Sequence, residues 1–415
     1  MRGNNMSQSS VRTYQAKYEY SGKEAGADIR FSPEFYNADN SVYSSDIACF
    51  SAALCMVGYD LPWAEKKPEE TGIYKILSEM GMESIRFDVG TGREEVDSIF
   101  ACLHTRIGGV PSVLVCACFV GSHHGQWYAN FEAGTGKLHK GFEICEENEY
   151  KKLLSYIREV CRENERTVLH ISGHSRGGAT AGIIAKHLMS DGIYAAPSDV
   201  FAYTFAAPAY VRLESENENV KGIFNFINRE DFVVRCMPEK WGYTRYGTAV
   251  VLPGTDCREN YGEVLTRANS YYSRFTAGGI YYPFKNGTKA VTKVVNSICE
   301  SVPDINSYYS LKFRTPAGKL SLEEYFQKSL CVVTAEVSDP EKSKPGTMLL
   351  LKSSLMRFRT APVIRAVSDF FIIYEGLSGA VKGNLFRNYF SSTHDMCTYC
   401  ALLMADTEKE SNNEN

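Results

Sequence analysis

The 415-residue sequence lacks the features that mark membrane and secreted proteins. Residues 1–19 are polar and hold no apolar segment of the kind found in signal peptides. No run of about 18 consecutive apolar residues is present, so no helix is expected to span a bilayer. We therefore expect a cytoplasmic protein without stable membrane insertion.

The sequence also has little imbalance of charge. Its formal net charge is -4, and it contains neither a polybasic run nor a basic half. Binding to nucleic acids or anionic membranes relies on clustered Lys and Arg side chains. Nucleic acid is therefore not an expected partner, and an uncharged substrate suits the composition better. The oligomeric state cannot be inferred from these features.

Regularly spaced cysteines are missing as well. The 13 cysteines are odd in number, and several lie inside apolar runs such as residues 115–119. In a reducing compartment such cysteines act as small core residues, so no disulfide framework is expected. Cys397 and Cys400 have the spacing of a metal or redox site, but no second pair completes a zinc set. We predict no metal and no cofactor.

Apolar residues make up 44% of the chain, which is enough for a large core. Residues 112–120 form a nearly continuous apolar run, typical of a strand buried on both faces. Its alternation with further elements predicts an α/β fold with a mostly parallel sheet covered by helices on both faces. The other predicted strands are 167–172, 200–205 and 222–227, and the predicted helices are 47–56, 71–80, 146–161 and 179–189.

Changes in amino-acid composition along the chain suggest five regions. Residues 1–40 are interrupted by Gly, Asn, Ser and charges, and we interpret them as a poorly structured arm or a few edge strands. Residues 41–258 form the expected core. Residues 259–390 are rich in Tyr, Phe, Lys and Arg and include the helical stretches 289–299 and 360–374, which favours a largely helical cap insertion. Residues 391–405 would return to the core, and 406–415 would be a charged tail.

The run from Gly173 to Gly177, Gly-His-Ser-Arg-Gly, fits the pattern G-x-S-x-G. In this motif a sharp turn between a strand and a helix exposes the serine hydroxyl, and the glycines make the turn possible. The bare pattern is weak evidence. Here, however, it lies between an apolar strand at 168–171 and a helix of small residues at 179–185. Ser175 is therefore the predicted nucleophile.

A serine nucleophile needs an imidazole to accept its proton and a carboxylate to orient that imidazole. In α/β hydrolases the chain order is Ser, then Asp or Glu, then His. Seven of the eight histidines precede Ser175 or lie on the helix directly behind it, which leaves His394. His394 is therefore the predicted base.

The carboxylate is expected beyond the carboxyl end of a strand. Asp231 meets this condition, because it follows the predicted strand 222–227 by a short turn. Glu230 is a neighbouring rival, and Asp256 is a weaker third choice. Asp199 precedes its strand and so lies at the wrong edge of the sheet. Asp231 is the predicted acid.

Acyl transfer also needs N–H donors for an oxyanion. The residue after the nucleophile, Arg176, supplies one expected donor, and the loop after strand 112–120 supplies the second. Within that loop Gly121 allows close approach, and Ser122 offers an amide and a hydroxyl. His123 and His124 flank the loop and are expected to lie at the rim.

These motifs together resemble the class 3 lipase family, the fungal-type branch of the α/β hydrolases. The resemblance covers about residues 110–255 and then His394. Its motifs follow in order at residues 119–122, 127–131, 139–142, 173–178, 205–208 and 228–238. The resemblance implies a triad of Ser175, Asp231 and His394, and an oxyanion hole lined by Ser122 and Arg176.

The sequence departs from the family pattern at three places. Val120 stands where the family usually has Arg, and Arg176 replaces an apolar residue after the nucleophile. Arg176 is similar instead to a Lys found there in some bacterial relatives. The chain between Asp231 and His394 is also far longer than in compact family members. These departures bear on the substrate more than on the chemistry.

The resemblance implies an intracellular hydrolase for small-molecule or lipid carboxylic esters, a lipase or esterase that works through an acyl-enzyme. The aromatic-rich insertion would form a cap over an apolar acyl pocket. Acyl transfer, or hydrolysis of thioesters or amides, is an alternative on the same scaffold. A non-catalytic binding protein is a further alternative, against which the intact Ser, Asp and His count.

Overall fold

We describe the fold from a computed structural model of the chain. The structure describes residues 11–61, 66–90, 92, 94–122, 129–130, 132–213, 220–255, 261–283, 287–310, 312–315, 318–321 and 392–413. The predicted helix 360–374, the rest of 322–390, His123, His124 and Asp256 lie outside these residues.

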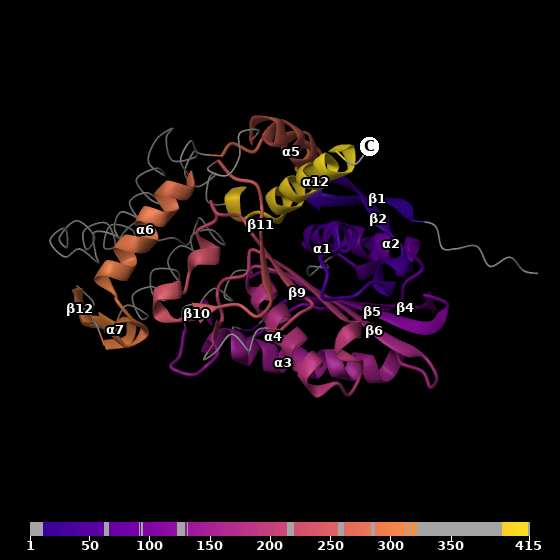
Figure 1. Cartoon of the computed structure of the whole chain (residues 1–415), viewed down its shortest axis with the longest axis horizontal. Coiled ribbons are helices and arrows are strands. Elements are labelled where there is room, and N and C mark those ends of the chain that lie inside the picture. The colour runs from indigo at the N-terminus through magenta and orange to yellow at the C-terminus, as the bar shows by residue number, and fades with distance from the viewer. Residues whose placement is uncertain are drawn as a thin grey trace, which may run out of the picture.

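A seven-stranded sheet forms the centre of the molecule, in the order β11-β9-β7-β6-β5-β4-β3 (Figure 1). The strands from β11 to β5 pair in parallel, whereas β4 and β3 complete one edge antiparallel. This confirms the predicted mostly parallel sheet. The strands are β3 (Glu83–Asp88), β4 (Ser98–Ile107), β5 (Val110–Phe119), β6 (Arg166–His174), β7 (Val200–Phe205), β9 (Ile223–Ile227) and β11 (Thr248–Val251).

The sequence pattern does not predict β3, β4 or β11. β3 and β11 are edge strands whose residues are half-buried or exposed, so they lack the apolar run of a central strand. β4 is buried at its start but carries polar residues toward its end. The apolar pattern is strongest where a strand is buried on both faces, and the predicted strands are of this kind.

Helices cover both faces of the sheet. The side chains of β5 alternate between the two layers: Leu114 and Cys116 join the core on the α1 side, whereas Val113 and Val115 join the core on the α3 and α4 side. This explains the unbroken apolar run in the sequence. The helices are α1 (Ser45–Val57), α3 (Lys140–Val160) and α4 (Arg176–Asp191).

The N-terminal residues form a hairpin of β1 (Arg12–Tyr20) and β2 (Lys23–Phe31), separate from the central sheet. Its inward side chains, including Tyr18 and Ile29, are buried against α1, α2 (Gly72–Glu79) and α5 (Tyr261–Phe275). Residues 11–31 thus form strands, the second of the two alternatives predicted for this region, and pack on the core. Charged residues alternate with apolar ones along these two strands, so the sequence shows no continuous apolar run there.

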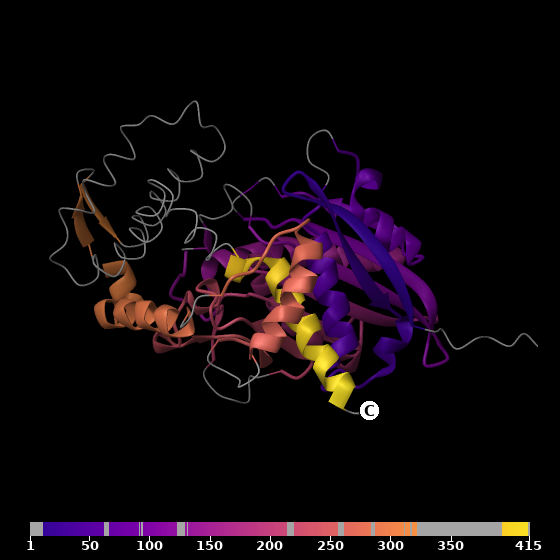
Figure 2. The same cartoon turned by 90° about the horizontal axis from the view of Figure 1, so that it is seen from above.

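The last helix, α12 (Met396–Asn413), packs against α1 and against α5 (Tyr261–Phe275), as both views show (Figures 1 and 2). The buried residues of α5, among them Val264, Ala268 and Phe275, fall on one helical face. α5 lies within the region predicted as the cap, and in the structure its apolar face packs in the core. The predicted charged tail is also helical as far as Asn413.

The remaining described elements lie to one side of the sheet (Figures 1 and 2). The indole N–H of Trp241 donates to the carbonyl of Val302 at 2.8 Å and links this part to the core. The predicted helix 289–299 lies within α6. The elements are α6 (Gly287–Ser301), α7 (Ile305–Ser310) and the hairpin of β12 (Lys312–Thr315) and β13 (Gly318–Ser321); near the core lie β8 (Val211–Arg212) and β10 (Tyr243–Thr244).

Two expectations about the helices concern membranes and metals. Within the described part of the chain, no helix is long and apolar enough to cross a membrane. Cys397 and Cys400 are buried in α12, where they pack in the core. Among the described residues no cluster of His, Cys, Asp and Glu suits a metal ion.

Candidate active site

Ser175 lies at the sharp turn between β6 and α4. Its backbone has a φ of 57° and a ψ of -124°, a conformation that is unusual for a residue with a side chain. The Ser175 N–H donates to the carbonyl of Phe205 at 2.8 Å, which ties the turn to β7. The strained turn presents the serine side chain beyond the carboxyl end of β6.

Glycines at two positions make this turn possible. A Cβ atom on Gly173 would lie 2.3 Å from the carbonyl oxygen of Gly177, and one on Gly177 would lie 2.2 Å from that of Phe119. Both distances are far too short for any side chain. The two glycines of the sequence motif are thus required by the close approach of β5, β6 and α4.

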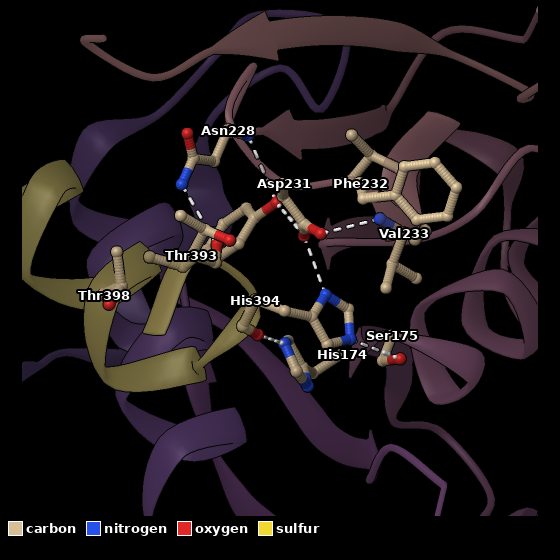
Figure 3. A network of polar contacts seen from close by, with 12 residues as sticks. His174, Ser175, Asn228, Asp231, Phe232, Val233, Thr393, His394 and Thr398 are labelled. Atoms are coloured by element: carbon tan, nitrogen blue, oxygen red, sulfur yellow. Dashed lines mark hydrogen bonds and ion pairs between the residues drawn. The ribbon is translucent and has the colours of Figure 1, made fainter. Parts of the chain in front are cut away.

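His394 reaches Ser175 from the other end of the chain, just before α12 (Figure 3). Its Nε2 atom lies 2.8 Å from Ser175 Oγ, and its Nδ1 atom lies 2.7 Å from Asp231 Oδ2. An ionised carboxylate can only accept hydrogen bonds, so Nδ1 carries the proton and Nε2 is free to accept from the serine. The structure thus brings together the three residues predicted as the triad.

Asp231 is buried in the turn after β9, and its carboxylate accepts three hydrogen bonds. The Val233 N–H donates to Oδ1 at 2.8 Å, whereas His394 and the Tyr399 hydroxyl both donate to Oδ2, Tyr399 at 2.8 Å. The Asn228 N–H in turn donates to the Tyr399 hydroxyl oxygen at 3.2 Å. These bonds compensate the burial of the charge and fix the carboxylate opposite His394.

The rival carboxylates point elsewhere. Glu230 is buried, but its Oε1 atom accepts hydrogen bonds from the Thr255 hydroxyl at 2.6 Å and the Thr255 N–H at 3.2 Å. Asp199 precedes β7 and pairs with Arg166 at the opposite end of the sheet. Asp256 lies outside the described residues. Among the described carboxylates proposed from the sequence, Asp231 alone contacts His394.

Other described histidines have partners away from Ser175. His104 lies 2.8 Å from Glu165, and His187 lies 2.8 Å from Glu146. His139 and His170 are buried, and burial lowers the pKa of each to about 3. Their rings are therefore neutral at physiological pH, and neither contacts the nucleophile.

The loop after β5 lies directly against the nucleophile. A Cβ atom on Gly121 would be 3.1 Å from the Cβ of Ser175, so the absence of a side chain lets the two segments touch. Ser122 follows half-buried, and its hydroxyl oxygen accepts a hydrogen bond from the Asn130 side-chain amide at 3.1 Å. This is the placement expected for the second oxyanion donor, and the donor role itself stays a prediction.

Arg176 is the first residue of α4, so its N–H lies at the positive end of the helix dipole. Its side chain is 1% exposed. Burial lowers the pKa of His139, and the nearby Arg176 guanidinium lowers it further. Burial raises the pKa of Cys145, and the charge of Arg176 opposes that rise. Arg176 therefore places a positive charge behind the nucleophile turn, where the resembled family has an apolar side chain.

Three residues near the triad are missing from the sequence predictions. Tyr399 lies on α12, and Tyr59 and His174 bond to each other at 2.5 Å beside the nucleophile. His174 is visible in the sequence as the residue before Ser175, and Tyr399 lies five positions after His394. Tyr59 carries no comparable signal, because it comes from the loop after α1.

Comparison with known families gives one match, between residues 117–241 and the model of Lipase (class 3). The matched segment starts within β5 and ends at Trp241. It includes Ser175 and Asp231 but ends well before His394. No curated protein matches the chain in sequence.

Several solved lipase structures are similar to part of the chain. One describes a serine protease triad as the catalytic centre of a triacylglycerol lipase (18% identity, TM-score 0.40, covering 52% of this chain and 83% of that chain). The triacylglyceride lipase of Rhizomucor miehei is 20% identical with a TM-score of 0.32, and the match covers 41% of this chain and 67% of that chain. A lipase of Rhizopus microsporus var. chinensis is 15% identical with a TM-score of 0.35, and the match covers 51% of this chain and 75% of that chain. Residues 117–241 are thus similar to class 3 lipases, and the mostly parallel sheet with its turn at Ser175 agrees with the predicted α/β-hydrolase fold.

Proposed function

We propose that the chain is a serine hydrolase that cleaves carboxylic esters, with lipids as the expected substrate class. The observation that carries the proposal is the hydrogen-bonded series from Ser175 Oγ through His394 to Asp231, at 2.8 Å and 2.7 Å. A nucleophile, a base within reach of its proton and a carboxylate orienting that base are what acyl transfer requires. The match to class 3 lipases points to lipid esters.

In the first half of the proposed reaction, Ser175 Oγ attacks the ester carbonyl carbon while its proton passes to His394 Nε2. The imidazolium that forms is stabilised by Asp231, which already holds Nδ1–H. The tetrahedral intermediate then collapses. His394 gives its proton to the departing alcohol, and the acyl group stays on Ser175.

In the second half, a water molecule enters where the alcohol left. His394 accepts a proton from the water, and the resulting hydroxide attacks the acyl carbon. Collapse of the second tetrahedral intermediate releases the carboxylic acid and returns the proton to Ser175. The triad is then ready for another cycle.

Both intermediates carry a negative oxygen that needs donors. We propose the backbone N–H groups of Arg176 and Ser122 for this role. The position of Arg176 at the start of α4 and the contact of Gly121 with Ser175 support this assignment. The positive charge of the Arg176 side chain would add to the favourable field at this end of the helix.

Hydrolysis of p-nitrophenyl esters of increasing chain length tests the proposal. We expect turnover in the intact protein and its loss in Ser175→Ala. Ser172→Ala is the matched control, because Ser172 is a buried serine on β6, just before the Ser175 turn, and its hydroxyl donates to the carbonyl of Ala117 at 3.4 Å. Turnover that persists in Ser175→Ala would contradict the nucleophile assignment.

The same assay with matched thioesters and anilides decides the class of acyl bond. We expect the oxygen esters to give the highest kcat/KM, since the matched family consists of lipases. A clear preference for thioesters, or for transfer to an added alcohol over hydrolysis, would instead support one of the alternatives on this scaffold.

The cysteines bear on the proposed compartment. All eleven cysteines within the described residues are free, and the Cys118 thiol donates a hydrogen bond to Cys55 Sγ at 3.9 Å instead of forming a disulfide with it. Burial raises the pKa of both Cys55 and Cys400, so these thiols are unreactive. We infer a reducing compartment, as in the cytoplasm. Free-thiol titration of the freshly isolated, denatured protein would contradict this if it found disulfides.

A further inference from the structure

His174 precedes the nucleophile, but its ring bonds away from Ser175. Its Nε2 atom lies 2.9 Å from the carbonyl oxygen of His394, and its Nδ1 atom lies 2.5 Å from the hydroxyl of Tyr59. The rings of His174 and His394 are 4.9 Å apart between centroids. Figure 3 shows His174 directly below the turn that carries His394. The imidazole of His174 thus holds the backbone of His394, the proposed base, through a hydrogen bond to its carbonyl.

The partners of His174 determine where its proton lies. A carbonyl oxygen can only accept, so Nε2 must be the protonated nitrogen that donates to His394. Nδ1 then accepts the hydroxyl proton of Tyr59. Burial, together with the nearby His394, lowers the pKa of His174 well below its usual value, so the ring stays neutral with this proton arrangement. It keeps the same arrangement when His394 becomes positively charged.

Tyr59 continues the series to the other side of the site. Its hydroxyl oxygen accepts a hydrogen bond from the Gly121 N–H at 3.2 Å. Gly121 is the residue that touches Ser175 and precedes Ser122. Three consecutive bonds therefore run from the Gly121 loop, through Tyr59 and His174, to the backbone of His394.

We propose that Tyr59 and His174 are positioning residues that hold the His394 turn and the Gly121 loop in register around Ser175. This rests on the proposed function, because it concerns the geometry of the same triad. His394 and the Gly121 loop come from distant parts of the chain. The hydrogen-bonded series through Tyr59 and His174, called the relay below, joins them through the rigid imidazole ring of His174. Misplacement of a catalytic group by about 1 Å can cost about 100-fold in rate.

Two substitutions at His174 separate its two bonds. The side-chain amide of Gln can place its nitrogen near the position of Nε2, so His174→Gln can still donate to the His394 carbonyl. Asn is one methylene shorter and can reproduce only the Nδ1 side, toward Tyr59. We expect His174→Asn to lower kcat about 10- to 100-fold with a much smaller change in KM, and His174→Gln to recover most of the loss.

Tyr59→Phe tests the other link, and the chain offers a matched control. The Tyr36 hydroxyl bonds to Nδ1 of His170 at 2.9 Å. His170 lies on β6, four residues before His174 on the same strand. Tyr36→Phe removes the same kind of bond away from the triad. We expect both variants to lose thermal stability, but only Tyr59→Phe to lower kcat, by about tenfold. Equal kcat values in Tyr59→Phe and Tyr36→Phe would show a merely structural role and overturn the proposal.

Nitrogen-15 NMR of histidine-labelled protein gives a readout that does not depend on activity. We expect the His174 ring to be neutral with the proton on Nε2 throughout pH 5 to 9. A proton on Nδ1, or a charged ring in this range, would overturn the relay even in an active enzyme. Failure of the proposed function is distinct, because it would appear as an inactive wild-type protein whose His174 still shows the expected tautomer.

Discussion

The segment at 117–241 and the elements that flank it contribute to the site in different ways. The segment holds the proposed nucleophile Ser175 and the proposed acid Asp231 on short turns after β6 and β9, next to the strands that position them. The flanks supply His394, which follows Asp231 by 163 residues, and Tyr59, which precedes His174 by 115. The hydroxyl of Ser175 is placed by a local turn, whereas the imidazole of His394 is placed by contacts between distant segments.

This difference has a physical basis. The turn at Ser175 is fixed by backbone contacts between adjacent strands, where no side chain fits. The His394 turn has no strand of its own, and it is held by individual hydrogen bonds. They come from His174, from Asn228, whose side chain donates to the Thr393 carbonyl at 3.0 Å, and from Tyr20, whose hydroxyl donates to Asp395 at 2.6 Å. The flanks are thus where single substitutions should shift the geometry most readily.

The largest effect is expected at the base itself. His394→Ala should lower ester hydrolysis at least about 10,000-fold, nearly as much as Ser175→Ala, because the two groups act as one unit. His104→Ala serves as the control, since His104 pairs with Glu165 away from the site. Measured kcat values for the three variants decide this. If His394→Ala kept more than a tenth of the wild-type rate, the flank would not supply the base.

The next effect concerns the acid. Asp231→Asn should lower kcat about 1,000- to 10,000-fold, because an amide no longer holds the proton on Nδ1 of His394. Glu230→Gln is the matched control one residue away, where the side chain can still accept from Thr255. We expect less than about a tenfold change there. A larger loss in Glu230→Gln than in Asp231→Asn would exchange the two assignments.

A smaller effect should separate two tyrosines of the N-terminal hairpin. Tyr20 donates to Asp395 beside the base, whereas Tyr18 donates to the carbonyl of Phe275 at 2.8 Å. Changing either to Phe should cost about 1 kcal/mol in the free energy of unfolding. Only Tyr20→Phe should also lower kcat, by several-fold, since Asp395 follows His394 directly. Equal kcat values in the two variants would show that the hairpin supports the fold without positioning the base.

The smallest effect at neutral pH concerns acid stability. His139 and His170 have folded-state pKa values of about 3, lowered mainly by burial, against about 6.5 in the unfolded chain. Below pH 6.5 the unfolded state binds protons that the folded state does not. Stability is therefore complete above 6.5 and falls toward pH 3, by about 1.4 kcal/mol per pH unit for each histidine.

Urea unfolding between pH 6.5 and 4 measures this slope. His170→Asn should unfold with a smaller pH slope than wild type, because it removes one of the buried histidines that bind a proton only in the unfolded state. His187→Asn is the control. Glu146 raises the pKa of His187, so protonation of His187 favours the folded state, and its contribution to the pH slope has the opposite sign. An unchanged slope in His170→Asn would show that His170 is not neutral in the folded protein.

Much of the matched segment could be predicted from the sequence, because its signals are local. Continuous apolar runs mark the doubly buried strands, and the glycines around Ser175 mark the turn. Asp231 was favoured over Glu230 by its position after β9, but only the direction of the two side chains separates them. His394 followed from chain order and from the scarcity of histidines.

The flanking elements were harder to predict, because their signals depend on contacts with distant residues. The hairpin of β1 and β2 has too much charge on its outer face to suggest a buried inner face. The sequence of α5 is amphipathic like that of a surface helix, and only the structure shows that α12 packs against it. Tyr59 and Tyr399 are ordinary aromatic residues in the sequence, and their roles exist only through their hydroxyl partners.

Ser175 is proposed to be activated by His394, a histidine from outside the matched segment. Reaction with a fluorophosphonate followed by mass mapping tests this most directly, in wild type, His394→Ala and His104→Ala. We expect label on the Ser175 peptide in wild type and His104→Ala, and at least about a 1,000-fold slower reaction in His394→Ala. Label on another residue, or equal labelling rates in wild type and His394→Ala, would contradict the account.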